Sequence, residues 1–462
     1  MRQMANIHFM PIVALRNRPK EGIHPGRILS NIFETLDHAG IAYCVLHGYE
    51  NFPYTLDSDV DCLIDAKVSA RQLLELFDQN CENIGAEVVH CRGRYIVLAS
   101  RKADGSHCFV TLDVAAHCEM EDVRYFEGSN ILATRRRFGA FWVPAPELEF
   151  AAYLIRTINR CEVDQKRATR LGNIYQQDPR GCAHRIADFW SPDNVLLITN
   201  AAQFGNWDEV RKHARRLKTQ LRLNGVLGSP AHFIANKLRS WLDRAARFCR
   251  PDGISVVFLG PDGAGKSSII AALASRMRVI FPRHECWGFA PSPLNAFRKS
   301  GGTTNTPHAL KPRSLLVSVL RAGYWFAYHI YSYLAIRAEL ARSTLLLHDR
   351  SFLDILVDQR RYRYAGPIWV LRFLWWLAPK PDLIILLDAA PEVLQARKQE
   401  VVLEVTERQR HAYLELIQTM SNRRVIDAAA PLTHVADRAT AVVLDHLRRR
   451  LAKRFKIEVL PF

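Results

Sequence analysis

The hydrophobic pattern of the C-terminal half predicts strands that alternate with helices. Two short apolar runs, "STLLLHD" (343–349) and "DLIILLD" (382–388), each end in an acid. Apolar runs without polar alternation are typical of parallel strands covered by helices on both faces. A third run, "ISVVFLG" (254–260), leads through a glycine-rich loop into the helical pattern "SSIIAALASRM" (267–277). We predict a parallel α/β domain over residues 253–462, with ligand sites at the carboxyl ends of its strands.

The pattern of the N-terminal half predicts a mixed α+β region followed by helices. A helix over residues 28–39 precedes several strand-like runs, and the last two of these flank the segment "RKADG". Asp104-Gly105 in that segment is a typical hairpin turn, so the two strands should pair antiparallel. From Pro146 onward apolar residues recur at helical spacing. The predicted regions are an extension (1–27), an α+β domain (28–125), and a helical domain with a basic linker (126–250).

Composition and charge narrow the choice of partners. The 462 residues are 48% hydrophobic and 24% charged, as in an ordinary globular protein, and carry a net charge of +17. This charge favours anionic partners such as nucleotides, nucleic acid or lipid headgroups. Residues 211–250 hold eleven lysines and arginines and one acid, Asp243. We interpret this stretch mainly as the solvated face of helices, with a nucleic-acid surface as the less favoured alternative. Ten cysteines without a Cys-x-x-Cys pair make a reducing cytoplasm the expected location.

Two apolar stretches raise the question of a membrane segment. Residues 315–336 contain Arg321 and His329, and residues 367–379 contain Arg372. Neither is a clean run of about 20 apolar residues, so we expect no transmembrane segment. We predict that both are core helices, and peripheral membrane attachment is the alternative.

The segment "GPDGAGKSS" (260–268) carries the clearest chemistry in the chain. It has the complete spacing of a phosphate loop, and it lies between a predicted strand and a predicted helix. Glycines let several backbone N–H groups point at one phosphate, and the helix N-terminus adds partial positive charge. Lys266 can reach the β and γ phosphates, and the Ser267 hydroxyl can ligate magnesium. The predicted nucleotide-binding residues are Gly260, Pro261, Asp262, Gly263, Ala264, Gly265, Lys266, Ser267 and Ser268.

This loop resembles that of the thymidylate kinase family, in which an acid precedes the second glycine, as Asp262 does here. "HDRSFLD" (348–354) is similar to the family's Asp-Arg-Tyr element, with Ser351 in place of the aromatic residue. "PDLIILLDAAPEVLQARKQE" is similar to its strand and arginine-bearing lid, and "RVIDAA" to its last strand. The resemblance covers roughly residues 253–455. It implies a three-layer αβα kinase domain that uses ATP and Mg²⁺.

The resemblance also implies roles for individual residues. Asp349 would hold magnesium together with Ser267, and Asp262 would orient the acceptor. Guanidinium groups bind phosphate oxygens bidentately, which suits Arg350 and Arg397 to the transferred group. An exposed helix arginine is the alternative for Arg397. The predicted catalytic residues are Lys266, Asp262, Asp349, Arg350 and Arg397.

A second set of acids lies near the N-terminus. "LHGYENFPYTLDSDVDCLID" (46–65) resembles the nucleotidyltransferase superfamily, in which a glycine pair precedes Asp-x-Asp on a strand. Asp59 and Asp61 would share one face of that strand, and Asp113 on a neighbouring strand would complete a magnesium site. Tyr49 follows Gly48 where the superfamily has a serine, which leaves the activity of this module open. An acidic turn without a metal is the alternative.

These observations predict an ATP-dependent kinase fused to a nucleotidyltransferase-like module. Its γ-phosphoryl acceptor would be a nucleoside monophosphate or a related small molecule. The segment "CWGFAPSPLNAFRKSGGTTNTPHALKPRS" does not align with the part of thymidylate kinases that binds the acceptor, so other acceptors stay open. The alternatives are a kinase of a sugar, lipid or glycan precursor and a nucleic-acid-binding NTPase. Homodimer formation is also left open.

Overall fold

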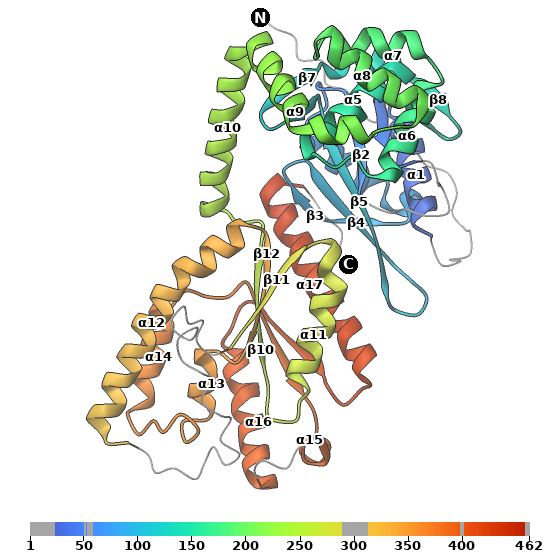
Figure 1. The fold of residues 1–462 in the computed structure, drawn as a ribbon. Coiled ribbons are helices and arrows are strands. Elements are labelled where there is room, and N and C mark those ends of the chain that lie inside the picture. The colour runs from blue at the N-terminus through green and yellow to red at the C-terminus, as the bar shows by residue number, and fades with distance from the viewer. Residues whose placement is uncertain (1–23, 50–51, 53–58, 289–312, 398–401, 458–462) are drawn as a thin grey trace, which may run out of the picture. The chain divides into compact units, whose positions relative to one another are not determined.

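The computed structural model describes residues 24–49, 52, 59–288, 313–397 and 402–457. The chain divides into two compact units (Figure 1). The N-terminal unit comprises residues 1–242 and 450–460, and the C-terminal unit comprises residues 243–449 and 461–462.

The first part of the chain forms a five-stranded mixed sheet, two small hairpins and a set of helices. Strands β4 and β5 pair antiparallel across the predicted turn at Asp104-Gly105, which confirms the hairpin. Strands β2 and β5 are parallel, in the sheet order β1-β2-β5-β4-β3. The elements are α1 (Pro25–His38), β1 (Tyr43–His47), β2 (Val60–Ile64), α2 (Ala70–Gln79), α3 (Cys81–Ile84), β3 (Glu87–Arg92), β4 (Tyr95–Arg101), β5 (His107–Ala115), β6 (Cys118–Met120), β7 (Val123–Phe126), α4 (Gly128–Ala133), β8 (Arg136–Phe138), β9 (Phe141–Val143), α5 (Pro146–Arg160), α6 (Gln165–Tyr175), α7 (Pro179–Ile186), α8 (Pro192–Phe204), α9 (Asp208–Gly228) and α10 (Pro230–Cys249).

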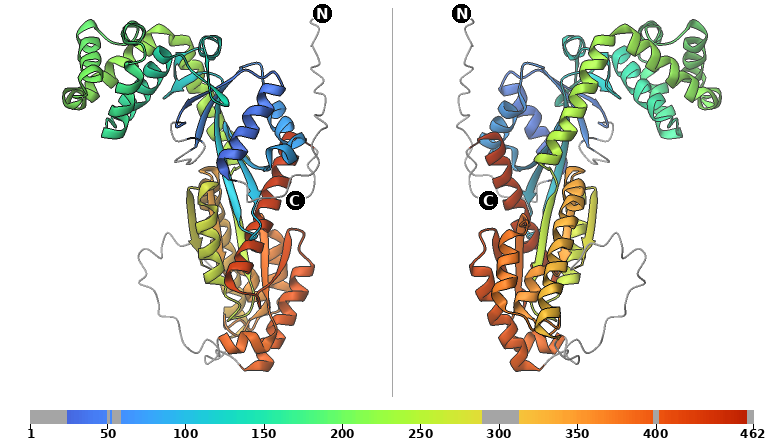
Figure 2. Two further views of the ribbon diagram at one scale, coloured as in Figure 1. Left: turned by 90° about the vertical axis from the view of Figure 1, so that its right-hand side faces the viewer. Right: turned by 90° about the vertical axis from the view of Figure 1, so that its left-hand side faces the viewer.

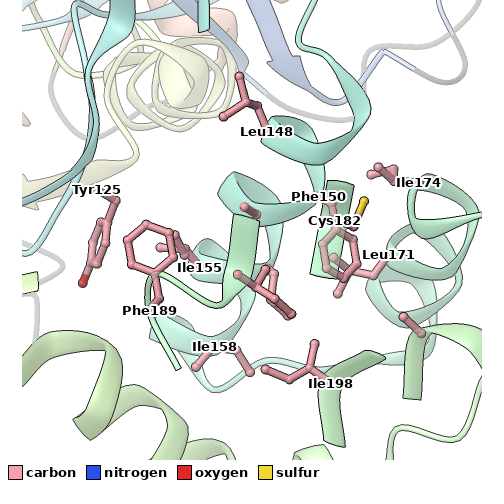
Figure 3. Close-up of a cluster of buried hydrophobic side chains, with 14 of the residues drawn as sticks. Tyr125, Leu148, Phe150, Ile155, Ile158, Leu171, Ile174, Cys182, Phe189 and Ile198 are labelled. Carbon is pink, nitrogen blue, oxygen red and sulfur yellow. The ribbon is translucent and has the colours of Figure 1, made fainter. Parts of the chain in front are cut away.

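Helices α5 to α9 share one hydrophobic core with part of the first sheet. Phe150 and Ile158 of α5, Leu171 of α6 and Ile198 of α8 are fully buried and point toward one another (Figure 3). Helix α5 begins at the predicted Pro146, whose fixed backbone suits the first turn of a helix. Truncating a buried aromatic side chain such as Phe150 to alanine typically costs about 3–5 kcal/mol. This core therefore joins the helical region to the sheet.

The C-terminal unit contains the predicted parallel sheet. Its strand order is β11-β12-β10-β13-β14, all neighbours are parallel, and helices cover both faces (Figure 2). The elements are β10 (Ile254–Leu259), α11 (Lys266–Arg276), a 3₁₀ turn (Met277–Val279), β11 (Arg283–Trp287), α12 (Leu315–Ala341), β12 (Thr344–Asp349), α13 (Phe352–Val357), α14 (Ile368–Leu377), β13 (Leu383–Asp388), α15 (Pro391–Arg397), α16 (Leu403–Gln418), β14 (Arg423–Asp427) and α17 (Leu432–Phe455), whose residues from 450 onward belong to the N-terminal unit.

The strand order fixes where a ligand can bind. Strand β10 is buried along its whole length and lies between β12 and β13, which follow it in sequence. After β10 the chain first forms β11 and β12 on one side of that strand, and later forms β13 and β14 on its other side. In open α/β sheets, ligands bind at this reversal, beyond the carboxyl ends of the strands. The glycine loop that follows Leu259 lies at this point.

The two apolar stretches form α12 and α14, and the prediction that both are core helices is wrong for one face of each. Ala322 of α12 and Leu371 and Trp375 of α14 are buried in the core of the unit. The opposite faces of both helices are exposed, with Trp376 of α14 73% exposed. Within the described residues, no helix is long and apolar enough to cross a membrane.

Candidate functional site: the phosphate loop and the strand ends around it

The glycine loop follows directly from the central strand and leads into α11. Gly260 has a φ of +145°, and a Cβ at this position would lie 2.6 Å from the carbonyl oxygen of Leu387 on β13. Only glycine fits so close to the neighbouring strand. Gly265 has a φ of +82° and caps the start of α11. The first N–H groups of a helix have no partner within it, so they point at whatever the loop encloses.

Lys266 lies inside the loop. Its ammonium group donates to the carbonyl oxygens of Gly260 (2.6 Å) and Pro261 (2.9 Å), and the residue is 7% exposed. Burial lowers the pKa of Lys266, while the nearby carboxylates of Asp262 and Asp354 oppose this shift. A buried ammonium at the N-terminus of a helix is well placed to bind a phosphate group.

Ser267 and Asp349 come together as predicted. The Ser267 hydroxyl donates to Oδ2 of Asp349 over 2.8 Å, which links α11 to the end of β12. The other carboxylate oxygen of Asp349, Oδ1, is buried and has no hydrogen-bond partner among the described residues. A buried carboxylate oxygen beside a hydroxyl is a donor set that suits Mg²⁺. The residues present therefore fit the predicted metal.

Asp262 contacts two arginines. Its Oδ1 accepts from Arg350 (2.8 Å) and its Oδ2 accepts from Arg361 (2.5 Å). Burial alone would raise the pKa of Asp262, but Lys266, Arg361 and Arg350 together outweigh burial and lower the pKa. Because both carboxylate oxygens accept from guanidinium groups, Asp262 serves here to hold two positive charges beside the loop. Its predicted contact with an acceptor would require one of these bonds to open.

Arg350 is held in an unusual backbone conformation. Its φ is +81°, which non-glycine residues seldom adopt and which is often found at functional sites. The side chain lies between Asp262 and Tyr362, and these neighbours raise the pKa of Arg350 against the opposing effect of burial. A charged guanidinium is therefore fixed close to Lys266, as the predicted phosphate-binding role requires.

Arg361 was not found by the sequence analysis. It lies after α13, in the arginine-rich segment "QRRYR" that follows the Asp-Arg element. A run of arginines a few residues beyond a strand-end acid was the available signal. The segment could not show which of these arginines faces the loop.

Arg397 takes a different place from the one predicted for a lid. It donates to the carbonyl oxygens of Ala428 (2.8 Å) and Ala429 (3.3 Å), just after β14. Arg410 of α16 instead forms a bidentate pair with the strand-end Asp388, at 2.7 and 2.9 Å. The segment 398–401, within the predicted lid, lies outside the described residues. A phosphate contact for Arg397 stays a prediction.

The three N-terminal acids lie near one another but already interact with other side chains. Asp61 and Asp113 are register partners on the parallel strands β2 and β5. Asp61 accepts from Arg156 (2.9 Å) and lies 3.1 Å from His47, while Asp113 pairs with Arg94 at 2.6 Å. Asp59 precedes β2 and is exposed. In the described parts of the chain, no three acid, histidine or cysteine side chains are grouped around one metal position.

Tyr49, where the sequence resemblance would place a serine, belongs to a buried polar network. Its hydroxyl donates to Oε1 of Glu149 (2.7 Å), which also accepts from Arg170 (3.1 Å). Burial raises the pKa of Glu149, and the bonds from Tyr49 and Arg170 oppose this shift. Gly48 before it has a φ of +84°. The tyrosine hydroxyl therefore stabilises the interior in this structure.

The C-terminal unit has the architecture of phosphate-loop kinases and NTPases, with the loop after the central parallel strand and a strand-end aspartate beside its serine. No family model matches the chain. A thymidylate kinase from Thermomicrobium roseum is 32% identical over 219 residues, covering 42% of this chain and 96% of the relative. The chain belongs to the thymidylate kinase family and is a phosphotransferase.

Part of the chain is also similar to two solved structures. A thymidylate kinase from Candida albicans is 15% identical, with a TM-score of 0.31, covering 44% of this chain and 92% of that one. A thymidylate kinase from Ehrlichia chaffeensis is 15% identical, with a TM-score of 0.31, covering 41% of this chain and 98% of that one.

The clamp formed by Asp262 with Arg350 and Arg361 gives a testable prediction. Replacing Arg361 with alanine removes one of the two charges that Asp262 holds beside the loop, so we expect kcat/KM for phosphoryl transfer to fall by about tenfold or more. Lysine should restore only part of it, because lysine lacks the planar fork of arginine. The control is Arg360→Ala, since Arg360 is adjacent and exposed. Equal activity of the two alanine variants would show that the clamp does not matter for transfer.

Proposed function

We propose that the C-terminal unit transfers the γ-phosphoryl group of ATP, with Mg²⁺, to a nucleoside monophosphate or a related small acceptor. The observation that carries this proposal is the pairing of Ser267 with Asp349 beside the buried Lys266. Phosphoryl transfer needs charge neutralisation and alignment, with little covalent work by the protein. The loop, Lys266 and Arg350 supply fixed positive charge for this purpose.

Each residue of the site has a separate proposed role in phosphoryl transfer. The N–H groups at the start of α11 would bind the β and γ phosphates, and Lys266 would move from the loop carbonyls to the phosphate oxygens. Ser267 and Asp349 would hold Mg²⁺, which supplies charge neutralisation when bound. Arg350 would stabilise negative charge on the transferred group, since Asp262 fixes its guanidinium nearby.

The name of the T. roseum relative favours thymidine monophosphate as the acceptor. The segment expected to bind the acceptor comprises residues 286–314, of which 289–312 lie outside the described residues. The alternatives from the sequence are therefore kept: a sugar, lipid or glycan precursor. The test is transfer of labelled γ-phosphate from ATP to nucleoside monophosphates and phosphorylatable sugars. A nucleic-acid-dependent NTPase would instead hydrolyse ATP faster when nucleic acid is added.

We also propose a cytoplasmic location, which the ten free cysteine thiols support. Whether two copies associate is to be settled by sedimentation of the purified chain.

Lys266→Ala should nearly abolish transfer. Lysine acts on charge that grows in the transition state, so we expect kcat to fall by about a hundredfold or more while the protein stays folded. The measurement is labelled phosphate transfer at saturating ATP and Mg²⁺, with near-UV circular dichroism to confirm the fold. Turnover at the wild-type rate would remove the loop from the proposed mechanism.

Asp349→Asn should raise the concentration of Mg²⁺ needed for half-maximal activity by about tenfold, because the amide is a weaker ligand than the carboxylate. The matched control is Asp427→Asn, which changes another strand-end acid of the same sheet, on the edge strand β14. The proposed metal site is contradicted if both variants keep the magnesium dependence of the wild type.

We further propose that Asp59, Asp61 and Asp113 bind a divalent metal, as in the resembled superfamily. The side-by-side register of Asp61 and Asp113 supports this proposal. The metal would have to compete with Arg156 and Arg94, which now bind these two carboxylates. The expected affinity is therefore modest. The role would be nucleotidyl transfer or metal-dependent binding of a phosphorylated ligand.

Mn²⁺ should raise the unfolding midpoint of the full-length chain by about 3 °C, because a ligand that binds only the folded state stabilises it. The chain should carry Asp349→Asn, so that the kinase site contributes little. Adding Asp61→Asn should abolish the shift, whereas the exposed Asp193→Asn should leave it unchanged. If Mn²⁺ has no effect before Asp61 is changed, the acids are internal ion pairs only.

A further inference from the structure

Helix α14 exposes a row of large aromatic side chains. Trp369, Phe373 and Trp376 are 66%, 51% and 73% exposed, and their spacing puts them on one face of the helix. Leu371 and Trp375, on the opposite face, are buried in the core of the C-terminal unit. Isolated exposed apolar residues are common, but a row of two tryptophans and a phenylalanine indicates an interaction surface.

Helix α12 carries a second row of exposed apolar side chains. It packs against α14, and the two helices lie side by side in the C-terminal unit (Figure 1). Its outward side chains are also apolar or aromatic, at positions that recur with helical spacing. The aromatic face comprises Trp369, Phe373, Trp376, Leu320, Tyr324, Tyr331 and Leu334, and each of its members is more than half exposed.

The two segments that carry the aromatic face are basic. Residues 313–338 and 359–381, which include the face, contain arginines and one lysine but neither Asp nor Glu. Arg372 and Lys380 are exposed at α14 and just beyond it. Arg321 of α12 lies over the Trp325 ring at 4.9 Å. Burial lowers the pKa of Arg321 most, and the nearby positive charges of Arg313 and Arg363 lower it further.

We propose that the aromatic face binds the surface of an anionic lipid bilayer. Tryptophan and tyrosine favour the level of the lipid headgroups, where their rings are buried and their polar atoms stay hydrated. The surrounding cations match anionic headgroups, which attract each basic residue by about 1 kcal/mol. Neither helix qualifies as a membrane span, so α12 and α14 would lie along the bilayer surface. This inference does not depend on the identity of the acceptor.

The same charges argue against a second copy of the chain as the occupant. A two-fold contact places a surface against itself. Arg372 and Lys380 of the two copies would then approach one another without an acid from these segments to pair with them. Like charges that lose solvent at an interface are destabilising. An anionic bilayer meets both the apolar area and the positive charge.

The test is sedimentation of the full-length chain with vesicles. We expect it to bind vesicles of equal parts phosphatidylcholine and phosphatidylglycerol, and to bind pure phosphatidylcholine about tenfold less, since the attraction is partly electrostatic. High salt should release the protein. The double variant Trp369→Ser/Trp376→Ser should reduce binding by about tenfold or more while retaining kinase activity.

The matched control is Trp241→Ser. Trp241 is 63% exposed on α10, which is also rich in lysine and arginine. Binding should survive this change. A second variant, Arg372→Glu/Lys380→Glu, keeps the tryptophans and should also lose binding to the anionic vesicles, which covers the case in which the serine variant fails to fold.

Three results would overturn the proposal. The first is no binding of the wild type to anionic vesicles. The second is binding that depends on Trp241 rather than on Trp369 and Trp376. The third is a lipid-free dimer, seen by sedimentation equilibrium, that the Trp369→Ser/Trp376→Ser variant dissociates, since the face would then join two copies of the chain.

Discussion

The close approach of Gly260 to strand β13 determines the geometry of the kinase site. A Cβ here would lie 2.6 Å from the Leu387 carbonyl oxygen, so any other residue would push the loop away from the sheet. The loop would then no longer wrap the Lys266 ammonium, whose two hydrogen bonds go to loop carbonyls. Ser267 follows directly in the chain, and its bond to Asp349 ties the same turn to β12. The absence of a Cβ at Gly260 therefore permits the positions of the loop, Lys266 and Ser267.

The parts of this site that depend on local order in the chain could be predicted from the sequence. A strand, a glycine loop and a helix follow one another, and Asp349 ends a strand that must be parallel to the first. Parallel pairing brings that acid to the loop without any knowledge of side chains. The contact of Asp262 with Arg361 joins residues 99 positions apart, within a loop that has no repeating pattern. Such a contact depends on the path of the loop, which periodicity does not encode.

The burial of α12 and α14 shows a second limit of sequence reasoning. Both helices are apolar on nearly all sides, and this pattern normally indicates a buried helix. The rest of the C-terminal unit covers only one face of each, so residues such as Trp376 are exposed in the described structure. The apolar pattern alone predicts burial for every face of the two helices. It could not show that one face of each stays exposed, because the number of layers in a fold is a global property.

Arginine–aspartate pairs have opposite consequences in the two units. In the C-terminal unit one carboxylate, Asp262, holds two guanidinium groups, so positive charge remains for a phosphate. In the N-terminal unit Asp61 and Asp113 each have their own arginine, so the negative charge that would attract a metal is largely cancelled. Asp61 and Asp113 lie on adjacent strands, but the prediction that Asp59 shares a strand with Asp61 is wrong, because β2 begins at Val60. Arg156 reaches Asp61 from α5, 95 residues away, and that contact decides how strongly a metal can compete.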